Sequence, residues 1–289
     1  MNFTKMHGIG NDYVYVNGFQ ETILQPEEMA RCVSNRYFSF GADGLILIKP
    51  SAIADFKMEM YNADGSKGKM CGNGIRCMAK YVYEKGLTKK QSMTIETLAG
   101  IREVELQLEK HLVKAVKVNM GLPVFATSEI PVRSSQKQIL YEKINILERD
   151  WNITCVSMGN PHCVIFMEEP IEDMDIEPIG SALQQHPMFP EGVNVEFINI
   201  QNKKELQMRV WERGSGETLA CGTGACAAVV AAALHGDTEE NVTVHLKGGD
   251  LEIFWDRESG QVYMTGTATE VYEGRLNYNS YDVWNKIID

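Results

Sequence analysis

The chain has 289 residues, of which 44% are hydrophobic and 23% are charged, a composition typical of globular domains rather than of a disordered chain. Its formal net charge of −11 argues against nucleic acid as a partner, because phosphate binding requires clustered Lys and Arg. No apolar run reaches the roughly 20 residues of a membrane span, and the first residues lack the apolar core of a signal peptide, so we expect a cytoplasmic protein with no membrane partner.

Strand and helix patterns alternate along the first half of the chain. Apolar runs predict strands at residues 13–16, 56–61, 92–97 and 112–118. A helix is predicted after Gly74, where apolar residues follow the spacing of one helix face: Ile75, Met78, Ala79 and Val82.

The second half repeats this pattern after a junction near residues 120–130, where Gly121 and Pro123 interrupt it. Strands are predicted at residues 163–166, 207–211, 242–246, 251–255 and 261–264. The helix after Gly224 is apolar on every side from Ala225 to Ala233, so other elements must enclose it. We expect a strongly curved sheet around this helix.

Matched blocks indicate that the two halves arose by duplication. Cys71-Gly72-Asn73-Gly74 recurs as Cys221-Gly222-Thr223-Gly224 at an offset of 150 (221 − 71), and chance rarely places two Cys-Gly-x-Gly sites in one chain. Gly10-Asn11 recurs in the same order as Gly159-Asn160. We therefore predict two domains, residues 1–120 joined by the C-terminal tail at about 270–289, and residues 121–269.

The paired cysteines are the strongest candidates for catalytic residues. A thiol at a helix N-terminus meets unpaired backbone N–H groups and the positive end of the helix dipole, so we expect a lowered pKa at Cys71 and Cys221. The adjacent glycines let backbone N–H groups approach a ligand as a cradle suited to a carboxylate. Two such sites predict that one thiolate removes a proton from one face of a carbon while the other thiol protonates the opposite face.

Three other interpretations of the pair stay open. Each Cys could be a small residue packed at a tight turn, or a nucleophile with His162 as its base, or half of a redox pair. A hydrolase has no evident use for a duplicated nucleophile, and a disulfide would be an oxidised, inactive state.

The remaining cysteines are predicted to be small buried side chains: Cys32, Cys77, Cys155, Cys163 and Cys226. The odd total of seven argues against a disulfide framework. No Cys-x-x-Cys occurs, so no metal site is predicted.

Blocks spread over almost the whole chain resemble those of the diaminopimelate epimerases. They run from Met6-His7-Gly8-Ile9-Gly10-Asn11-Asp12 to Gly266, and the others are Tyr61-Asn62-Ala63-Asp64-Gly65-Ser66, Met70-Cys71-Gly72-Asn73-Gly74-Ile75-Arg76, Met158-Gly159-Asn160-Pro161-His162, Gly192-Val193-Asn194-Val195-Glu196-Phe197, Trp211-Glu212-Arg213-Gly214 and Ala220-Cys221-Gly222-Thr223-Gly224. The resemblance implies interconversion of LL- and meso-diaminopimelate without pyridoxal phosphate or another cofactor, in lysine and peptidoglycan precursor synthesis. It also implies an α+β fold of two pseudo-symmetric lobes, each a curved, mostly antiparallel, barrel-like sheet around a central helix, with the ligand cleft between them, and a homodimer.

Carried over by position, the resemblance assigns roles to a set of residues. Cys71 and Cys221 are the two acid/bases. The reacting carboxylate is held at the helix N-termini by Gly72, Asn73, Gly222 and Thr223. The substrate's other groups are bound by Asn11, Asn62, Asn160, Asn194, Glu212 and Arg213. An Arg can hold a carboxylate through two parallel hydrogen bonds, and an Asn offers both a donor and an acceptor.

The two halves are not chemically equal. His162 and Glu212 fall opposite Tyr13 and Asn62, so both of these titratable groups lie in the second half. We predict that they tune thiol protonation or hold the reacting ammonium group. Gly44 stands where some family members carry Gln, opposite Asn194, so one substrate contact is expected to be lost or replaced by water.

Two other functions fit the same motifs. A racemase or epimerase of another amino acid would share the thiols, and a non-catalytic amino-acid-binding protein would share the pocket without needing them. Exchange of the substrate's α-hydrogen with solvent separates these alternatives.

Overall fold

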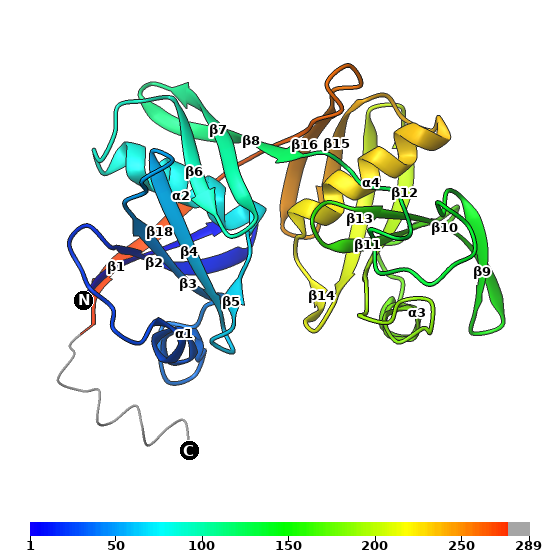
Figure 1. The fold of residues 1–289 in the computed structure, drawn as a ribbon, viewed down its shortest axis with the longest axis horizontal. Coiled ribbons are helices and arrows are strands. Elements are labelled where there is room, and N and C mark those ends of the chain that lie inside the picture. Colours follow the sequence, from blue (N-terminus) through cyan, green and yellow to red (C-terminus); the bar gives the residue numbers. More distant parts are fainter. Residues whose placement is uncertain (277–289) are drawn as a thin grey trace. The chain divides into compact units, whose positions relative to one another are not determined.

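The computed structural model describes residues 1–276, and the rest of the predicted C-terminal tail, residues 277–289, lies outside the described residues. The chain forms two compact units, Met1–Val118 together with the segment from Thr267, and Asn119–Gly266 (Figure 1). Between residues 1 and 276, no helix is long and apolar enough to cross a membrane.

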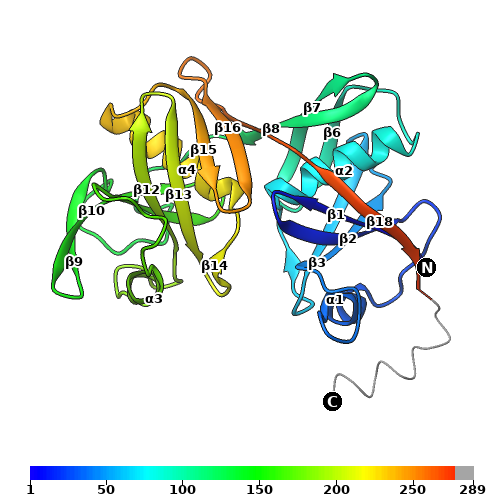
Figure 2. The same ribbon diagram turned by 180° about the vertical axis from the view of Figure 1, so that it is seen from behind.

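The first unit is a sheet wrapped around one helix. Its strands are β1 (Asn2–Gly8), β2 (Asn11–Asn17), β3 (Gly44–Lys49), β4 (Phe56–Asn62), β5 (Lys67–Gly68), β6 (Ser92–Thr97), β7 (Gly100–Glu109), β8 (Leu112–Gly121) and β18 (Thr269–Arg275). They pair in the order β18-β1-β2-β3-β4-β6-β7-β8, with β5 beside β4 and with β2–β3 and β4–β6 as the parallel pairs. Helix α2 (Gly72–Glu84) contacts β1, β2 and β7, and α1 (Pro26–Ser34) packs on β3 and β4. Figure 2 shows β18 beside β1.

The second unit has the same construction. Its strands are β9 (Glu142–Ile146), β10 (Arg149–Ser157), β11 (Pro161–Phe166), β12 (Asn194–Asn202), β13 (Glu205–Glu212), β14 (Gly216–Thr218), β15 (Asn241–Leu246), β16 (Gly249–Trp255) and β17 (Val262–Gly266). They pair in the order β9-β10-β11-β12-β13-β15-β16-β17, with β14 beside β13 and with β11–β12 and β13–β15 parallel. Helix α3 (Glu177–Gln184) packs on β12 and β13.

The strand registers confirm the duplication. In the first unit Tyr13 pairs with Gly44, and in the second unit His162 pairs with Asn194. Leu45 pairs with Tyr61, and Val195 pairs with Trp211 at an offset of 150 for both partners. The predicted α+β fold of two pseudo-symmetric lobes, each with a mostly antiparallel sheet around a central helix, is therefore confirmed.

The central helices explain the curvature of the sheets. Helix α4 (Gly222–His235) contacts β10, β11, β12, β13, β15, β16 and β17, and its residues from Gly224 to Ala233 are buried. Small side chains (mostly Ala) let the surrounding strands approach this helix on all sides, as the apolar sequence predicted. The buried face of α2 includes Ile75, Met78 and Val82, as its spacing predicted.

The flanking helices α1 and α3 had no predicted positions. They span 9 and 8 residues, too short for a clear periodic pattern. Each has a Pro in its first turn, and this is the sequence signal that marks them.

Candidate active site

Each predicted catalytic cysteine is the N-cap residue of a central helix. Cys71 and Cys221 have extended backbones, and each Sγ accepts a hydrogen bond from the backbone N–H three residues on, over 3.3 Å from Gly74 and 3.4 Å from Gly224. An N-cap acceptor satisfies one of the N–H groups that a helix leaves unpaired at its start. Both thiols therefore lie at helix N-termini, as the sequence predicted.

The glycines that follow the cysteines are required by close packing. A Cβ at position 74 would lie 2.7 Å from Cδ1 of Ile46, and a Cβ at position 224 would lie 2.6 Å from Oε1 of Glu196. A side chain at either position would force the end of the Ile46 or Glu196 side chain to move. The first turns of α2 and α4 therefore rest directly on strands β3 and β12.

Cys71 lies beside the predicted substrate residue Asn11. The Cys71 thiol donates to Oδ1 of Asn11 over 3.2 Å, and Nδ2 of Asn11 donates to Asp43 over 2.7 Å. Because Asp43 accepts from the amide nitrogen, the amide oxygen is held toward the thiol. Buried Tyr13 lies next to Cys71, and burial together with the nearby Cys71 and Asp43 raises the pKa of its hydroxyl well above the usual value.

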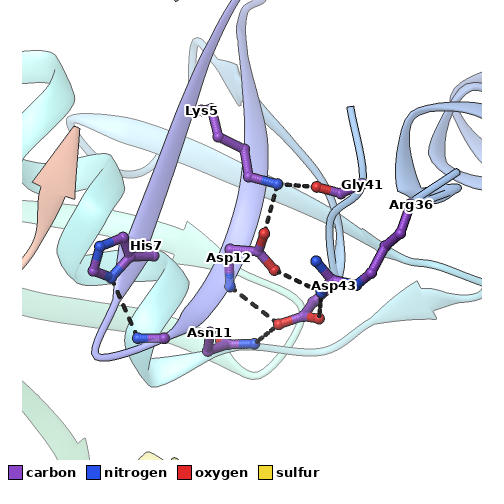
Figure 3. Close-up of polar contacts among 8 residues, drawn as sticks. Lys5, His7, Asn11, Asp12, Arg36, Gly41 and Asp43 are labelled. Carbon is purple, nitrogen blue, oxygen red and sulfur yellow. Dashed lines mark hydrogen bonds and ion pairs between the residues drawn. The ribbon is translucent and has the colours of Figure 1, made fainter. Parts of the chain in front are cut away.

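Charged side chains form a network around Asp43, the hydrogen-bond partner of Asn11 (Figure 3). Asp12 accepts from Lys5 at 2.5 Å and from Arg36 at 3.1 Å, and Arg36 also pairs with Asp43 at 2.9 Å. Burial opposes ionisation of Asp12, but Lys5 and Arg36 outweigh it and lower its pKa. Burial raises the pKa of Asp43, although the Asp12 backbone N–H and the Asn11 amide donate to it.

Cys221 lies in a different environment. It is buried, its Sγ lies 3.5 Å from the Thr223 hydroxyl, and Glu212 nearby accepts from the Thr218 hydroxyl over 2.5 Å. Burial raises the pKa of the Cys221 thiol well above its usual range, and the carboxylates of Glu212 and Glu196 raise it further.

The predicted lowering of the pKa at Cys221 is therefore wrong for the unliganded protein. The N–H groups at the start of α4 do act in the predicted direction, because the hydrogen bond from Gly224 lowers the pKa. Loss of water around the sulfur and two neighbouring carboxylates are stronger. A helix-start motif indicates the favourable N–H groups but neither the burial of the sulfur nor the nearby carboxylates.

His162 links two polar side chains, Asn160 and Glu196, and Glu196 was not among the residues predicted from the sequence. Its Nδ1 is 2.7 Å from Oε1 of Glu196, and its Nε2 is 3.0 Å from Oδ1 of Asn160. The side chains of His162 and Glu196 are both 0% exposed. The signal for Glu196 is its position two residues after Asn194 on one strand, because alternate residues share a sheet face.

The remaining predicted substrate residues lie at helix starts and strand ends of the two units. Asn73 and Thr223 occupy the first turns of α2 and α4, directly after Gly72 and Gly222. Asn73 is 3% exposed, and within residues 1–276 its Oδ1 has no hydrogen-bond partner, so this buried acceptor is available to a ligand. Asn62 ends β4 and donates to Ser66 over 2.9 Å.

Asn194 and Arg213 are tied together in the second unit. The amide of Asn194 donates to the Pro161 carbonyl over 2.9 Å and accepts from the Arg213 backbone N–H over 3.0 Å. The exposed Arg213 guanidinium donates to the Glu191 carbonyl over 2.9 Å. Asn194 therefore places the backbone of Arg213, while part of the guanidinium fork stays open to a ligand.

Steric constraints explain why position 44 is a glycine. A Cβ at this position would overlap the carbonyl oxygen of Tyr61 and lie 2.9 Å from Cε1 of Tyr13. The Gln found here in some resembling sequences does not fit this backbone. The site at this position is formed without a side chain.

Across residues 1–276, no cluster of three or more His, Cys, Asp or Glu side chains is placed to hold a metal ion. None of the seven cysteines, all within the described residues, forms a disulfide, and the five outside the predicted pair are buried. Burial raises the pKa of both Cys32 and Cys77 to about 11. These five are packing residues, as predicted.

Comparison with proteins of known sequence and structure places this arrangement in a family. Proteins named diaminopimelate epimerase from Acetivibrio thermocellus and from Methanococcus maripaludis strain LL are each 50% identical to the chain. Each alignment covers 96% of this chain, and it covers 99% of the Acetivibrio protein and 100% of the Methanococcus protein. Among solved structures, a probable proline racemase from Agrobacterium radiobacter has a TM-score of 0.73 at 15% identity, covering 97% of this chain and 94% of that one. A phenazine biosynthesis protein of the PhzF family from Bacillus anthracis has a TM-score of 0.70 at 20% identity, covering 96% and 99%. These structures show that the two-lobed fold is shared.

The model of the diaminopimelate epimerase family matches residues 3–126 and 154–271, which include both Cys-Gly-x-Gly helix starts and the strands that support them. Together with whole-length relatives at 50% identity, this match shows that the chain belongs to the diaminopimelate epimerase family.

Proposed function

We propose that this protein interconverts LL- and meso-diaminopimelate by a two-base reaction at one α-carbon, without pyridoxal phosphate. The observation that carries the proposal is the pair of cysteine-capped helices, one in each unit, at matched positions of a duplicated fold. The product would supply lysine and peptidoglycan precursor synthesis. We further propose that the protein works in the cytoplasm as a homodimer.

The chemistry requires a thiolate on one face of the α-carbon and a thiol on the other. The thiolate takes the α-hydrogen as its S–H bond forms and the Cα–H bond breaks. The electron pair left on carbon is stabilised through the carboxylate, and the opposite thiol then gives its proton to the other face. After one turnover the two sulfurs have exchanged protonation states, so the reverse reaction starts from the opposite arrangement.

The helix starts are suited to the reacting carboxylate. Backbone N–H groups around Gly72, Asn73, Gly222 and Thr223 belong to the first turns of α2 and α4, where unpaired donors favour an anion. Charge that develops on the carboxylate in the transition state meets donors that are already oriented. No electron sink beyond these donors is required by the proposal.

The substrate's other polar groups would meet the remaining residues. Arg213 offers guanidinium donors for the distal carboxylate, and Glu212 offers an acceptor for an ammonium group. Asn11 begins β2 and Asn62 ends β4 in the first unit, and in the second unit Asn160 directly precedes β11 and Asn194 begins β12. We propose His162 and Glu212 as auxiliary groups that tune the protonation of Cys221.

Solvent exchange tests the proposal. Purified protein incubated with LL-diaminopimelate in D₂O should incorporate deuterium at one α-carbon and yield the meso isomer, and Cys71→Ala and Cys221→Ala should each abolish the conversion. Exchange with proline or histidine derivatives but not with diaminopimelate would instead identify another amino-acid racemase. Binding without exchange of any α-hydrogen would identify a binding protein and overturn the proposal.

A further inference from the structure

A buried carboxylate lies under the start of only one of the two central helices. Glu196, on β12, is fully buried, and its Oε1 would lie 2.6 Å from a Cβ at Gly224. The N–H of Gly224 donates to Sγ of Cys221 over 3.4 Å. The carboxylate thus sits against the residue whose N–H holds the second thiol.

The matched position in the first unit is apolar. Ile46 lies 150 residues before Glu196, and its Cδ1 would lie 2.7 Å from a Cβ at Gly74. Both side chains therefore fill the same space under the helix start, one as a hydrocarbon and the other as an acid. A single difference between the halves changes the charge beneath the helix and leaves the packing similar.

Burial of this acid is costly unless a specific role or partner compensates it. Removing a carboxylate from water is unfavourable, and pairing offsets this cost only in part. Oε1 has His162 as its partner at 2.7 Å, whereas Oε2 has no hydrogen-bond partner in the described residues 1–276. An apolar residue, as in the first unit, would pack there without this cost.

The same pair orients the predicted substrate residue Asn160. Its Oδ1 can only accept a hydrogen bond, so Nε2 of His162 carries the proton over the 3.0 Å contact. Nδ1 of His162 then faces Oε1 of Glu196 over 2.7 Å. The amide nitrogen of Asn160 is left directed away from His162.

Asn11 is the counterpart of Asn160 in the first unit, and its amide group has a different set of partners. Asp43 accepts from the amide nitrogen of Asn11, which leaves the amide oxygen directed at Cys71. The duplicated Asn residues thus point their amide oxygens at different partners: Asn11 at the thiol of Cys71, and Asn160 at the ring of His162.

We propose that Glu196 is a positioning residue that makes the two thiol sites unequal: it keeps Cys221 in the thiol form in the resting protein and, through His162, directs the amide nitrogen of Asn160 toward the substrate. The inference rests on the proposed epimerase function and identifies which thiol is the resting acid.

The charges around Cys221 support this role. Glu196 faces it from β12 and Glu212 from β13, and after burial these two carboxylates are the causes that raise the pKa of Cys221. Glu196 also raises the pKa of buried Cys163 on β11, after the effects of Cys155 and burial. The opposing groups come from α4 itself, Thr223 and the N–H of Gly224. His162 on β11 completes the titratable groups in contact with Glu196.

The test measures each thiol separately in the free protein. Alkylation by iodoacetamide is followed across a pH series, and mass spectrometry of the peptides gives one midpoint for Cys71 and one for Cys221. Replacing Glu196→Gln should lower the Cys221 midpoint by about one pH unit, because a neutral amide no longer opposes the thiolate. The Cys71 midpoint should stay in place.

A second variant and a control separate charge from packing. Glu196→Ile, which copies the residue of the first unit, should lower the Cys221 midpoint as well and should raise KM more than Glu196→Gln does, since only Gln can still hydrogen-bond to His162. Glu59→Gln removes a partly buried carboxylate that pairs with Lys49 at 2.7 Å in the first unit, and it should leave both midpoints unchanged.

Thiolate ultraviolet absorbance in a Cys71→Ala background, with and without Glu196→Gln, repeats the measurement without a reagent that must reach the buried sulfur. An unchanged Cys221 midpoint in both Glu196 variants, or an equal shift of both cysteines, would overturn the inference. The midpoint measurements that decide the inference do not require turnover. Failure of the deuterium-exchange experiment would therefore count against the proposed reaction and leave the result on Glu196 standing.

Discussion

At the scale of single residues, Asp12 links stability to pH. Its pKa is lowered in the folded protein by Lys5 and Arg36, whose effect exceeds that of burial. A group with a depressed folded-state pKa contributes stability that is fully present above its unfolded pKa of about 3.9 and is lost as the pH falls through the folded value. Asp12→Asn should therefore destabilise the protein at pH 7, and the difference from the wild type should shrink below about pH 4.

Urea unfolding from pH 7 down to pH 3 measures this difference. Asp250→Asn is the control, because the side chain of Asp250 is 62% exposed and pairs only with His245 at the surface. Its difference from the wild type should stay small at every pH. A constant effect of Asp12→Asn over the whole range would show that the lost contribution is packing and not charge.

Gly44 is expected to be intolerant of any side chain. A Cβ there would overlap the Tyr61 carbonyl oxygen in the strand pair β3–β4, so the two strands would have to separate. We expect Gly44→Ala to reduce the free energy of unfolding by about 3 kcal/mol. Gly86→Ala, at a positive φ of 73° with open space around it, should cost only about 1 kcal/mol. Equal effects in urea unfolding would show that the close approach relaxes freely.

Candidate residues could be identified from the sequence where a motif marked them and not where burial decided their surroundings. Cys71 and Cys221 stood out because Cys-Gly-x-Gly occurs twice at one offset. Glu196 did not, because a Glu within an otherwise apolar strand is most simply placed on an exposed face. Only the three-dimensional structure shows that the strand carries this acid under the start of α4.

At the scale of elements, the cysteines have a structural duty as helix caps besides their proposed chemistry. Cys71→Ser keeps an N-cap acceptor for the Gly74 N–H, whereas Cys71→Ala removes it. We expect the alanine variant to lose about 1 kcal/mol of stability and the serine variant to lose little. Both should lose epimerase activity, because alanine has no acidic group and the serine hydroxyl is a far weaker acid than a thiol.

Thermal unfolding alongside the exchange assay separates the two duties. Cys226→Ser, deep within α4 and away from the N-cap position, is the matched cysteine control that should leave the chemistry in place. If Cys71→Ser kept wild-type activity, the proposed acid/base role of this thiol would be refuted.

Central helices were predictable and flanking helices were not, for reasons of length and periodicity. The apolar residues of α2 keep helical spacing from Ile75 to Val82 within a helix of 13 residues, and α4 is apolar throughout, so neither pattern fits a strand. Helices α1 and α3 provide about two turns each, and at that length tertiary packing decides whether a segment is helical.

At the scale of the whole molecule, the internal repeat was the most informative part of the sequence. It predicted two lobes of one construction, and the matched registers of β3 with β4 and β12 with β13 agree with it. The pairing of β1 with β18 is different, because it joins Asn2 to Arg275 across nearly the whole chain. We expected the tail at about 270–289 to join the first unit, but no local pattern encodes which strand it pairs with or in which register.

This long-range pairing predicts how the protein responds to truncation. β18 covers β1 from Asn2 to His7, Leu276 exchanges hydrogen bonds with Met1 at 2.8 and 3.0 Å, and Lys85 pairs with Glu270 and Glu273. The second unit is continuous in sequence and has its own apolar core around Phe197. A chain ending at Gly266 should therefore lose amide hydrogen-exchange protection in β1 and β2 while protection in β10–β13 remains. A chain ending at residue 276 is the control and should keep both sets of protected amides. Loss of protection in both units at once would show that the two units unfold as one, and unchanged protection in β1 would show that this edge of the sheet is stable without its partner strand.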